Sequence, residues 1–273
     1  MRIGILSDLH VDKNNDDEFG AVQEALCSAA SATNTDLLIV AGDISNNYVQ
    51  TLNVLEEIEE RAGIPCLFVP GNHDIWNLEH PELSTAYIYE ELQRHERNLS
   101  KGAYAINDEW IVLGDTGWYD FSYGSERFEP EQFRAMMYGN RTWKDKLYVN
   151  WGSTPEQITD HFYDKLQKQL EACGGKKVIL VTHVVNHDQF TVPMPHKDWD
   201  YFNAFLGSER YQELIRSYSR SVKYAVCGHV HYRKKISIGS TQFICNCLGD
   251  KKEWLHSKRA YEEVSKSYVT IDI

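Results

Sequence analysis

The sequence of 273 residues lacks any run of eighteen consecutive apolar residues, and it lacks an excess of basic side chains. Without a long apolar run, we expect no membrane-spanning helix. The chain carries 28 Lys and Arg against 40 Asp and Glu, a formal net charge of -12. A surface that coats nucleic acid needs Lys and Arg to neutralise phosphates, so this charge disfavours a nucleic-acid partner. The net negative charge does not exclude a pocket that bound metal ions make locally positive.

The cysteines show no paired spacing of the kind that zinc knuckles use. Cys245 and Cys247 are two residues apart in an apolar run, which places them on one face of a strand, and no second pair lies near them. We therefore interpret the six cysteines as reduced core residues of a cytoplasmic protein. Residues 3–6 form a short apolar run without a following cleavage site, so we expect no signal peptide.

Short apolar runs alternate with helical patterns in the first part of the chain. Residues 2–7, 37–40 and 64–69 are predicted as strands that are buried on both faces. Residues 15–32 and 48–61 have apolar side chains at helical spacing. This order of strands and helices predicts parallel strands with crossover connections. Ligands bind such sheets beyond the carboxyl ends of the strands.

The remainder of the chain gives a weaker pattern. We expect helices at 84–97, from Pro130 through Phe133, Met136 and Met137, after the capping box at 154–157, and near 208–219. We expect strands within 104–114 and at 177–181, 224–227, 235–238, 242–245 and 268–273. The last three strands are expected to be antiparallel. We interpret residues 1–273 as a single domain with an insertion at roughly 75–150.

Potential metal ligands follow five of the predicted strands. They are Asp8 with His10, Asp43, Asn72 with His73, His183, and His229 with His231. A spacing of two would place both members of a pair on the same side of an extended segment. Glycines precede Asp43, Asn72 and His229 and allow a close backbone approach. Alone, Asp-x-His and Asn-His-Asp are common in turns, Gly-Asp and a single His are weak signals, and His-x-His is moderately specific. Together, at one edge of a sheet, they indicate a shared metal site.

These segments resemble the calcineurin-like metallophosphoesterase superfamily. The matching segments, in order, are Asp8-Leu9-His10, Gly42-Asp43, Gly71-Asn72-His73-Asp74, His183 and Gly228-His229-Val230-His231. They span nearly the whole chain apart from its middle. The resemblance implies an α/β fold, a four-layer αββα sandwich with two central mixed β-sheets packed face to face and helices outside.

The resemblance also implies two metal ions. One would be held by Asp8, His10, Asp43 and His231, and the other by Asp43, Asn72, His183 and His229, with Asp43 as the bridge. Independently of the family, a mixture of oxygen and imidazole ligands suits manganese, iron or zinc better than calcium. Two such ions clamp a phosphate and activate a bridging water as hydroxide near neutral pH.

We therefore predict a phosphoester hydrolase, either a phosphodiesterase or a phosphatase, that acts on small molecules or nucleotides. His73 would protonate or stabilise the leaving oxygen, and Asp74 would hold the ring of His73. A structural role for Asp74, as a helix cap or turn residue, stays open. Residues 42–47 lack the arginine that phosphoprotein phosphatases carry after Gly-Asp, and Asp74 stands where those enzymes have Glu.

Three other functions remain as alternatives: a nuclease, a non-catalytic protein-binding scaffold, and a metal-dependent hydrolase of carbon esters or amides. No ligand position is missing, which disfavours the scaffold. The aromatic residues of segment 116–128 would either stack on a substrate base or pack the insertion onto the core. Further candidates near the pocket, chosen by charge or by nearness to His183, are Lys197, Arg210, Arg233 and residues 186–188. The sequence does not indicate an oligomeric state.

Overall fold

The computed structural model describes residues 1–15 and 20–273. Its first sheet has the strand order β12-β1-β2-β3, formed by Val269–Asp272, Arg2–Leu6, Leu37–Val40 and Cys66–Phe68. Strands β1, β2 and β3 are parallel, as predicted, and β12 is antiparallel to β1. Helices α1 (Val11–Asn14), α2 (Ala21–Ala32) and α3 (Tyr48–Ala62) connect the parallel strands. Part of the predicted helix at 15–32 falls on residues 16–19, which lie outside the described residues.

The second sheet has six strands in the order β10-β11-β9-β8-β5-β4. Their bounds are Arg233–Ile238, Thr241–Asn246, Val222–Cys227, Lys177–Thr182, Trp110–Asp115 and Tyr104–Ala105. The four inner strands are parallel, whereas the two edge strands, β10 and β4, are antiparallel to their neighbours. Both sheets are therefore mixed. The predicted antiparallel strands near the C-terminus are confirmed for β10, which pairs with β11, and for β12, which pairs with β1, whereas β11 also pairs in parallel with β9.

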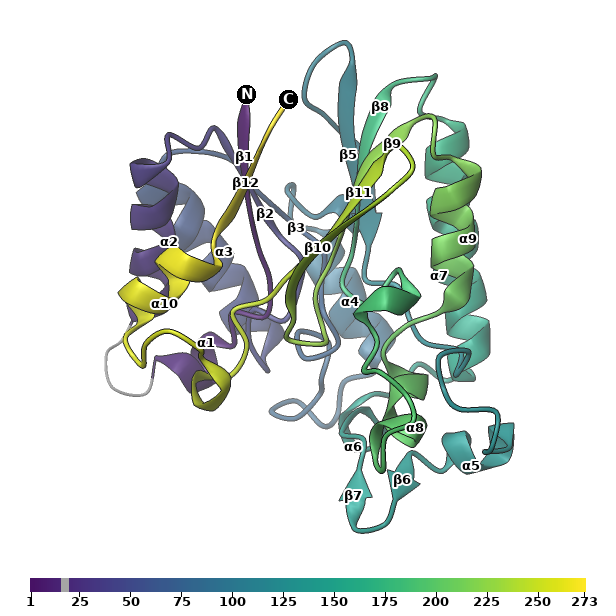
Figure 1. Ribbon diagram of the computed structural model, residues 1–273. Coiled ribbons are helices and arrows are strands. Elements are labelled where there is room, and N and C mark those ends of the chain that lie inside the picture. Colours follow the sequence, from purple (N-terminus) through teal and green to yellow (C-terminus); the bar gives the residue numbers. More distant parts are fainter. Residues whose placement is uncertain (16–19) are drawn as a thin grey trace.

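Helices cover the outer faces of the two sheets, and an apolar layer fills the space between them. Ile5 and Ile39 of the first sheet pack against Ile179 and Val226 of the second. Figure 1 shows α2, α3 and α10 (Ala260–Ser267) on one side of the molecule and α7 (Pro155–Glu171) and α9 (Glu209–Ser217) on the other. This arrangement confirms the predicted four-layer αββα sandwich with two central mixed β-sheets.

The middle of the chain contributes both to the sheets and to the structure beyond their carboxyl ends. Strand β5 lies inside the second sheet, so the range 75–150 is not one insertion outside the sheets. Besides β4 and β5, this range contains α4 (Thr85–Gln93), a 3-10 helix at Leu99–Lys101, α5 (Pro130–Arg134), β6 (Met137–Tyr138), β7 (Arg141–Thr142) and α6 (Asp145–Tyr148). Four later elements are α8 (Trp199–Phe202) and 3-10 helices at Asp188–Phe190, Asn203–Phe205 and Lys251–Glu253. The single-domain assignment stays a prediction.

Two predictions in this region can be judged directly. The helix from Pro130 ends at Arg134, before Met136 and Met137, because Met136 has a left-handed backbone with φ 49° and Met137 pairs with Thr142 in a hairpin. Among the aromatic residues of 116–128, Trp118, Tyr119 and Phe121 are buried in a cluster with Phe133. They pack segment 116–128 onto the core, which is one of the two predicted roles. No helix within residues 1–15 and 20–273 is both long enough and apolar enough to cross a membrane.

Candidate metal centre

The loops that carry the predicted ligands curl where the strands end. Positive φ angles occur at Asp8 (54°), His10 (42°), Asp43 (55°), His229 (73°) and His231 (55°). This conformation is uncommon for residues other than glycine and clusters at functional sites. The expectation that each pair lies on one side of an extended segment is therefore wrong, because the backbone turns at every member of both pairs.

Glycines allow these loops to touch, as the sequence predicted. A Cβ atom added to Gly42, whose φ is +86°, would lie 2.5 Å from His183 Nδ1. A Cβ atom added to Gly71 would lie 2.1 Å from Asp43 Oδ1. Contacts this short do not occur in proteins, so only glycine permits the approach of the Gly42 and Gly71 loops.

The predicted ligands of the first metal lie together. His10 Nε2 is 3.2 Å from His231 Nε2, and His231 Nε2 is 3.4 Å from Asp8 Oδ1. His10 Nε2 also lies 3.8 Å from Asp43 Oδ2. These four side chains, which come from three separate loops, face a common point.

The predicted ligands of the second metal meet on the other side of Asp43. His183 Nε2 lies 3.3 Å from Asp43 Oδ1, 3.1 Å from Asn72 Oδ1 and 3.1 Å from His229 Nδ1. Asp43 thus turns one carboxylate oxygen towards each cluster. The structure brings all seven predicted ligands together in the predicted division, while their binding of metal stays a prediction.

For three of the four predicted histidine ligands, a hydrogen bond on the far side of the imidazole ring determines which nitrogen faces inwards with a lone pair. His183 Nδ1 is 2.8 Å from the carbonyl oxygen of Ala41, His229 Nε2 is 3.1 Å from that of Phe205, and His231 Nδ1 is 2.6 Å from Glu253 Oε2. A ring nitrogen that donates to an oxygen leaves the other nitrogen as an acceptor. Acceptors converging within about 3 Å need positive charge between them, so the donor set fits two cations.

The pKa shifts of the buried side chains indicate the same demand for positive charge. Burial lowers the pKa of His183, but the charge of Asp43 and its hydrogen bond outweigh burial and raise the pKa to about 9. Burial raises the pKa of Asp43, yet His183 and His73 bring it well below its usual range. Burial lowers the pKa of His10 and of His229 to about 4. Asp43 is therefore ionised at neutral pH and available to bind cations.

His73 adjoins both clusters without belonging to either ligand set. Its backbone N–H donates to Asp43 Oδ1 at 2.9 Å, and its Nε2 lies 3.9 Å from Asp43 Oδ2. Its Nδ1 is 2.5 Å from Asn46 Oδ1, and its ring stacks on Trp76 with 3.7 Å between centroids. The His73 side chain is 17% exposed and lines the pocket. It can therefore reach a bound substrate.

Asp74 does not hold the ring of His73, and that prediction is wrong. Its carboxylate accepts hydrogen bonds from the backbone N–H groups of Gly71, Asp43, Ile44 and Ser45 and from the hydroxyl of Thr51, over 2.7–3.1 Å. These five donors occupy the carboxylate and tie two metal loops together, which is the structural alternative. Asn46 takes the place beside His73. The sequence offered one sign of this role, because Asn46 lies only three residues after the predicted ligand Asp43.

Two further carboxylates support the predicted ligands and were missed in the sequence. Glu253 contacts His231, and Asp145 accepts a hydrogen bond from Asn72 Nδ2 at 2.8 Å. Both residues lie more than 20 positions after their partners in the sequence, and neither belongs to a recognisable sequence motif. Only the fold places them at the site.

A pocket of about 690 Å³ opens onto the predicted ligands Asp43, Asn72, His229 and His231. Its remaining lining is mixed and includes aromatic side chains (Trp76, Trp143, Tyr148 and Trp199), basic ones (Lys13, Arg141, Lys144 and Lys252) and acidic ones (Asp145, Asp250 and Glu253). The predicted contacts Lys197, Arg210, Arg233 and residues 186–188, all within the described part of the chain, do not line it. Arg233 instead pairs with Glu263 at 2.6 Å, and Arg210 pairs with Asp160.

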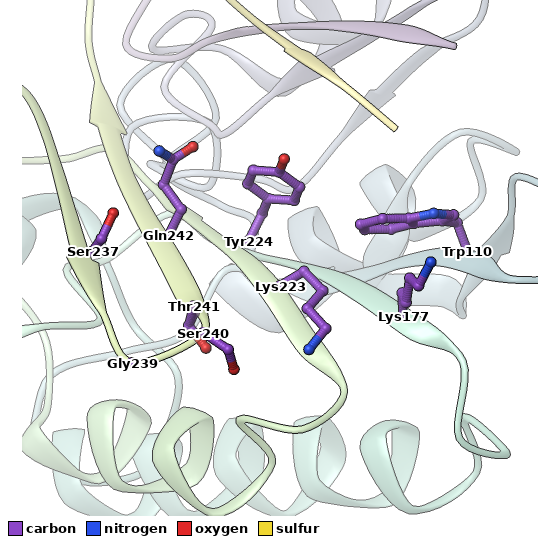
Figure 2. A pocket seen from close by; sticks show the side chains of 9 residues that line it. All are labelled: Trp110, Lys177, Lys223, Tyr224, Ser237, Gly239, Ser240, Thr241 and Gln242. Carbon is purple, nitrogen blue, oxygen red and sulfur yellow. The ribbon is translucent and has the colours of Figure 1, made fainter.

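A second hollow of about 400 Å³ lies at the other end of the second sheet. Figure 2 shows Trp110, Lys177 and Tyr224 at this hollow, where strands β5, β8 and β9 begin. No histidine or carboxylate is among its lining residues, all of which are described. This hollow therefore has no part in the metal chemistry.

Comparisons with known proteins agree with this fold. The sequence profile of the calcineurin-like phosphoesterase family matches residues 1–233. The chain is similar in structure to a phosphopantetheinyl hydrolase from Mycobacterium tuberculosis, with TM-score 0.75, 17% identity, and 92% of this chain and 90% of that one covered. A Thermus thermophilus protein, TT1561, gives TM-score 0.56 and 13% identity over 99% of this chain and 98% of that one.

A dimetal phosphatase from Danio rerio gives TM-score 0.52 and 15% identity over 90% of this chain and 86% of that one. No curated protein sequence matches the chain significantly. The structural likenesses, at these identities, show the fold, whereas the sequence match covers most of the chain. The chain thus belongs to the calcineurin-like phosphoesterase family, a family of metal-dependent phosphoester hydrolases.

Proposed function

We propose that the chain hydrolyses phosphoesters of small molecules or nucleotides with two ions of manganese, iron or zinc. The observation that carries this proposal is the position of Asp43. One of its oxygens faces His10 of the first cluster, and the other faces His183 of the second. A carboxylate with an acceptor cluster on each side is suited to bridge two cations.

The ligands divide the work of the proposed reaction. Asp8, His10, Asp43 and His231 would hold one ion, and Asp43, Asn72, His183 and His229 the other. The ions, when bound, supply Lewis acidity towards phosphate oxygens and an acidified water as the nucleophile. His73 faces the pocket beside Asp43, which supports a role in protonating or stabilising the leaving oxygen. Asn46 would hold the His73 ring in place.

The pocket supports a small substrate over a nucleic acid or a phosphoprotein. Its volume of about 690 Å³ is that of a small-molecule site, and its aromatic walls are suited to a base or another apolar group. Four basic and four acidic side chains line it, so the proposed metal ions would supply its excess of positive charge, and the chain's net charge of -12 disfavours a long polyanion. Phosphodiesterase and phosphatase activity both stay within the proposal. The six cysteines of the chain are free thiols, which also supports a cytoplasmic location for the protein.

The first test compares a diester with a monoester. We expect the purified chain to hydrolyse bis-p-nitrophenyl phosphate or p-nitrophenyl phosphate when manganese is added, and to leave p-nitrophenyl acetate intact. Asp43→Ala should abolish turnover and the binding of both ions, because the bridge is lost, and Asp36→Ala serves as a surface control. Turnover of only the carbon ester, or an Asp43→Ala protein with two ions and full rate, would refute the proposal. Absence of turnover and of bound metal would favour the scaffold alternative.

A further inference from the structure

A buried carboxylate outside the predicted ligand set contacts the candidate metal centre from α6. Asp145 is the first residue of α6 and is 2% exposed. Its Oδ1 accepts hydrogen bonds from Asn72 Nδ2 at 2.8 Å and Trp76 Nε1 at 2.7 Å. Its Oδ2 accepts from Trp143 Nε1 at 2.9 Å and from the hydroxyl of Tyr119 at 3.2 Å. Four neutral donors thus satisfy this buried charge.

The first of these hydrogen bonds fixes the orientation of an amide. Asn72 has one donor end and one acceptor end, and Asp145 takes the donor end. The acceptor Oδ1 therefore faces His183 Nε2, 3.1 Å away, in the second ligand cluster. If the amide turned over, its NH₂ group would point at the cluster and could not bind a cation.

Two further hydrogen bonds place indole rings against histidines of the site. Trp76 stacks on His73 with 3.7 Å between ring centroids and an interplanar angle of 30°. Trp143 meets His229 edge to face, with centroids 5.7 Å apart. Tyr119 differs from these donors, because its ring packs on Trp118, Phe121 and Phe205 rather than on a predicted ligand.

We propose that Asp145 is a positioning residue of the metal centre. Its carboxylate holds the Asn72 oxygen towards the second cation and holds two indoles against His73 and His229. The inference rests on the proposed function. It makes the segment from Arg141 to Tyr148 part of the catalytic unit, since that segment also supplies Lys144 and other residues of the pocket wall.

The test compares Asp145→Asn with the matched variant Tyr119→Phe. The amide group of the substituted side chain would point an N–H at one or more of the four donors, so the hydrogen bonds that hold Asn72 and the two indoles would be lost. We expect Asp145→Asn to weaken binding of the second manganese ion by about 10- to 100-fold, measured by titration calorimetry. Tyr119→Phe removes a donor that contacts no predicted ligand, and it should weaken binding far less.

A readout independent of activity is the indole N–H resonance in the metal-free protein. Asp145→Asn should move the signals of Trp76 and Trp143, whereas that of Trp254, which donates to the carbonyl oxygen of Gly249, should stay in place. Unchanged manganese affinity in Asp145→Asn, or an equal loss in Tyr119→Phe, would overturn the inference. A wild-type protein that binds no manganese would instead refute the proposed function.

A second variant decides the case in which Asp145→Asn does not fold. Trp76→Phe keeps an aromatic ring against His73 but loses the N–H that anchors it to Asp145. We expect kcat on p-nitrophenyl phosphate or bis-p-nitrophenyl phosphate to fall several-fold, because the ring that packs on His73 is no longer anchored to Asp145. An unchanged kcat would contradict the role of the carboxylate.

Discussion

Single residues at the ends of the strands combine an uncommon backbone with inward-facing side chains. Asp8, His10, Asp43, His229 and His231 all have positive φ angles. Such conformations cost about 1–3 kcal/mol each and persist where the surroundings enforce them. Here the enforcement includes Asp74, whose carboxylate binds backbone N–H groups of the loops of Asp43 and Gly71. The conformational free energy that these loops cost is consistent with a role in binding metal ions.

The contact between Asn46 and His73 gives a prediction at this scale. Asn46→Ala removes the acceptor 2.5 Å from His73 Nδ1 but touches no predicted ligand cluster directly. We expect kcat to fall by about tenfold, because the ring loses its fixed orientation, while two manganese ions still bind. Steady-state kinetics and metal analysis on the same preparation check this. Loss of the metals together with activity would show that Asn46 acts on the ligands instead.

Among the elements, α10 and the short helix at Lys251–Glu253 support the first cluster from outside the sheets. Glu263 of α10 is buried, accepts hydrogen bonds from the backbone N–H groups of Leu255, His256 and Ser257, and pairs with Arg233. This arrangement fixes the segment that carries Glu253, the partner of His231. An element far from the predicted ligands in sequence thus holds one of them.

The pH dependence of stability follows from Glu263. Burial alone would raise the pKa of Glu263, but the backbone N–H groups and Arg233 lower it from 4.5 to about 2. A lowered pKa contributes stability that is present above pH 4.5 and is lost as the pH falls towards 2. This contribution is at most about 3 kcal/mol.

Glu263→Gln should therefore lower the free energy of unfolding at pH 7 by up to about 3 kcal/mol and make it less dependent on pH between 5 and 3. Urea unfolding at several pH values measures both effects. The neighbouring exposed variant Glu262→Gln is the control and should change stability by less than about 0.5 kcal/mol. Equal effects of the two variants would contradict the assigned role of Glu263.

The elements also show what the sequence could and could not predict. Strands β1, β2 and β8 were predictable because each is mainly apolar and is followed within three residues by a predicted metal ligand. The parallel pairing of β11 with β9 was not predictable, because an apolar run of residues does not indicate which strand it pairs with or in which direction. Asp145 and Asn46 were missed because their function arises from contacts across the fold. Asp74 was misassigned because adjacency to His73 in sequence does not bring the two side chains together.

For the whole molecule, the two sheets are joined at the edge where the predicted ligands lie. The backbone N–H of Ser7, after β1, donates to the carbonyl oxygen of Asn246, at the end of β11, at 3.1 Å, and Leu248 N–H donates back to Ser7 at 2.9 Å. The ligands come from both sheets, with Asp43 from the first and His183 from the second. Metal binding should therefore stabilise the entire sandwich.

This link predicts a thermal shift. Manganese at 100 times its dissociation constant should stabilise the native state by about 2.7 kcal/mol, because unfolding separates the ligands. For a chain of this size, that raises Tm by about 5 °C, measured by differential scanning calorimetry. A chelator should reverse the shift, and Asp43→Ala should not show it. An equal shift in Asp43→Ala would mean that manganese stabilises the fold at another place.

The most direct measurement is anomalous diffraction from crystals grown with manganese. The account predicts two peaks about 3.5–4 Å apart, one on each side of the Asp43 carboxylate, with His10 nearest one peak and His183 nearest the other. A single peak, or peaks that lie away from Asp43, would contradict it.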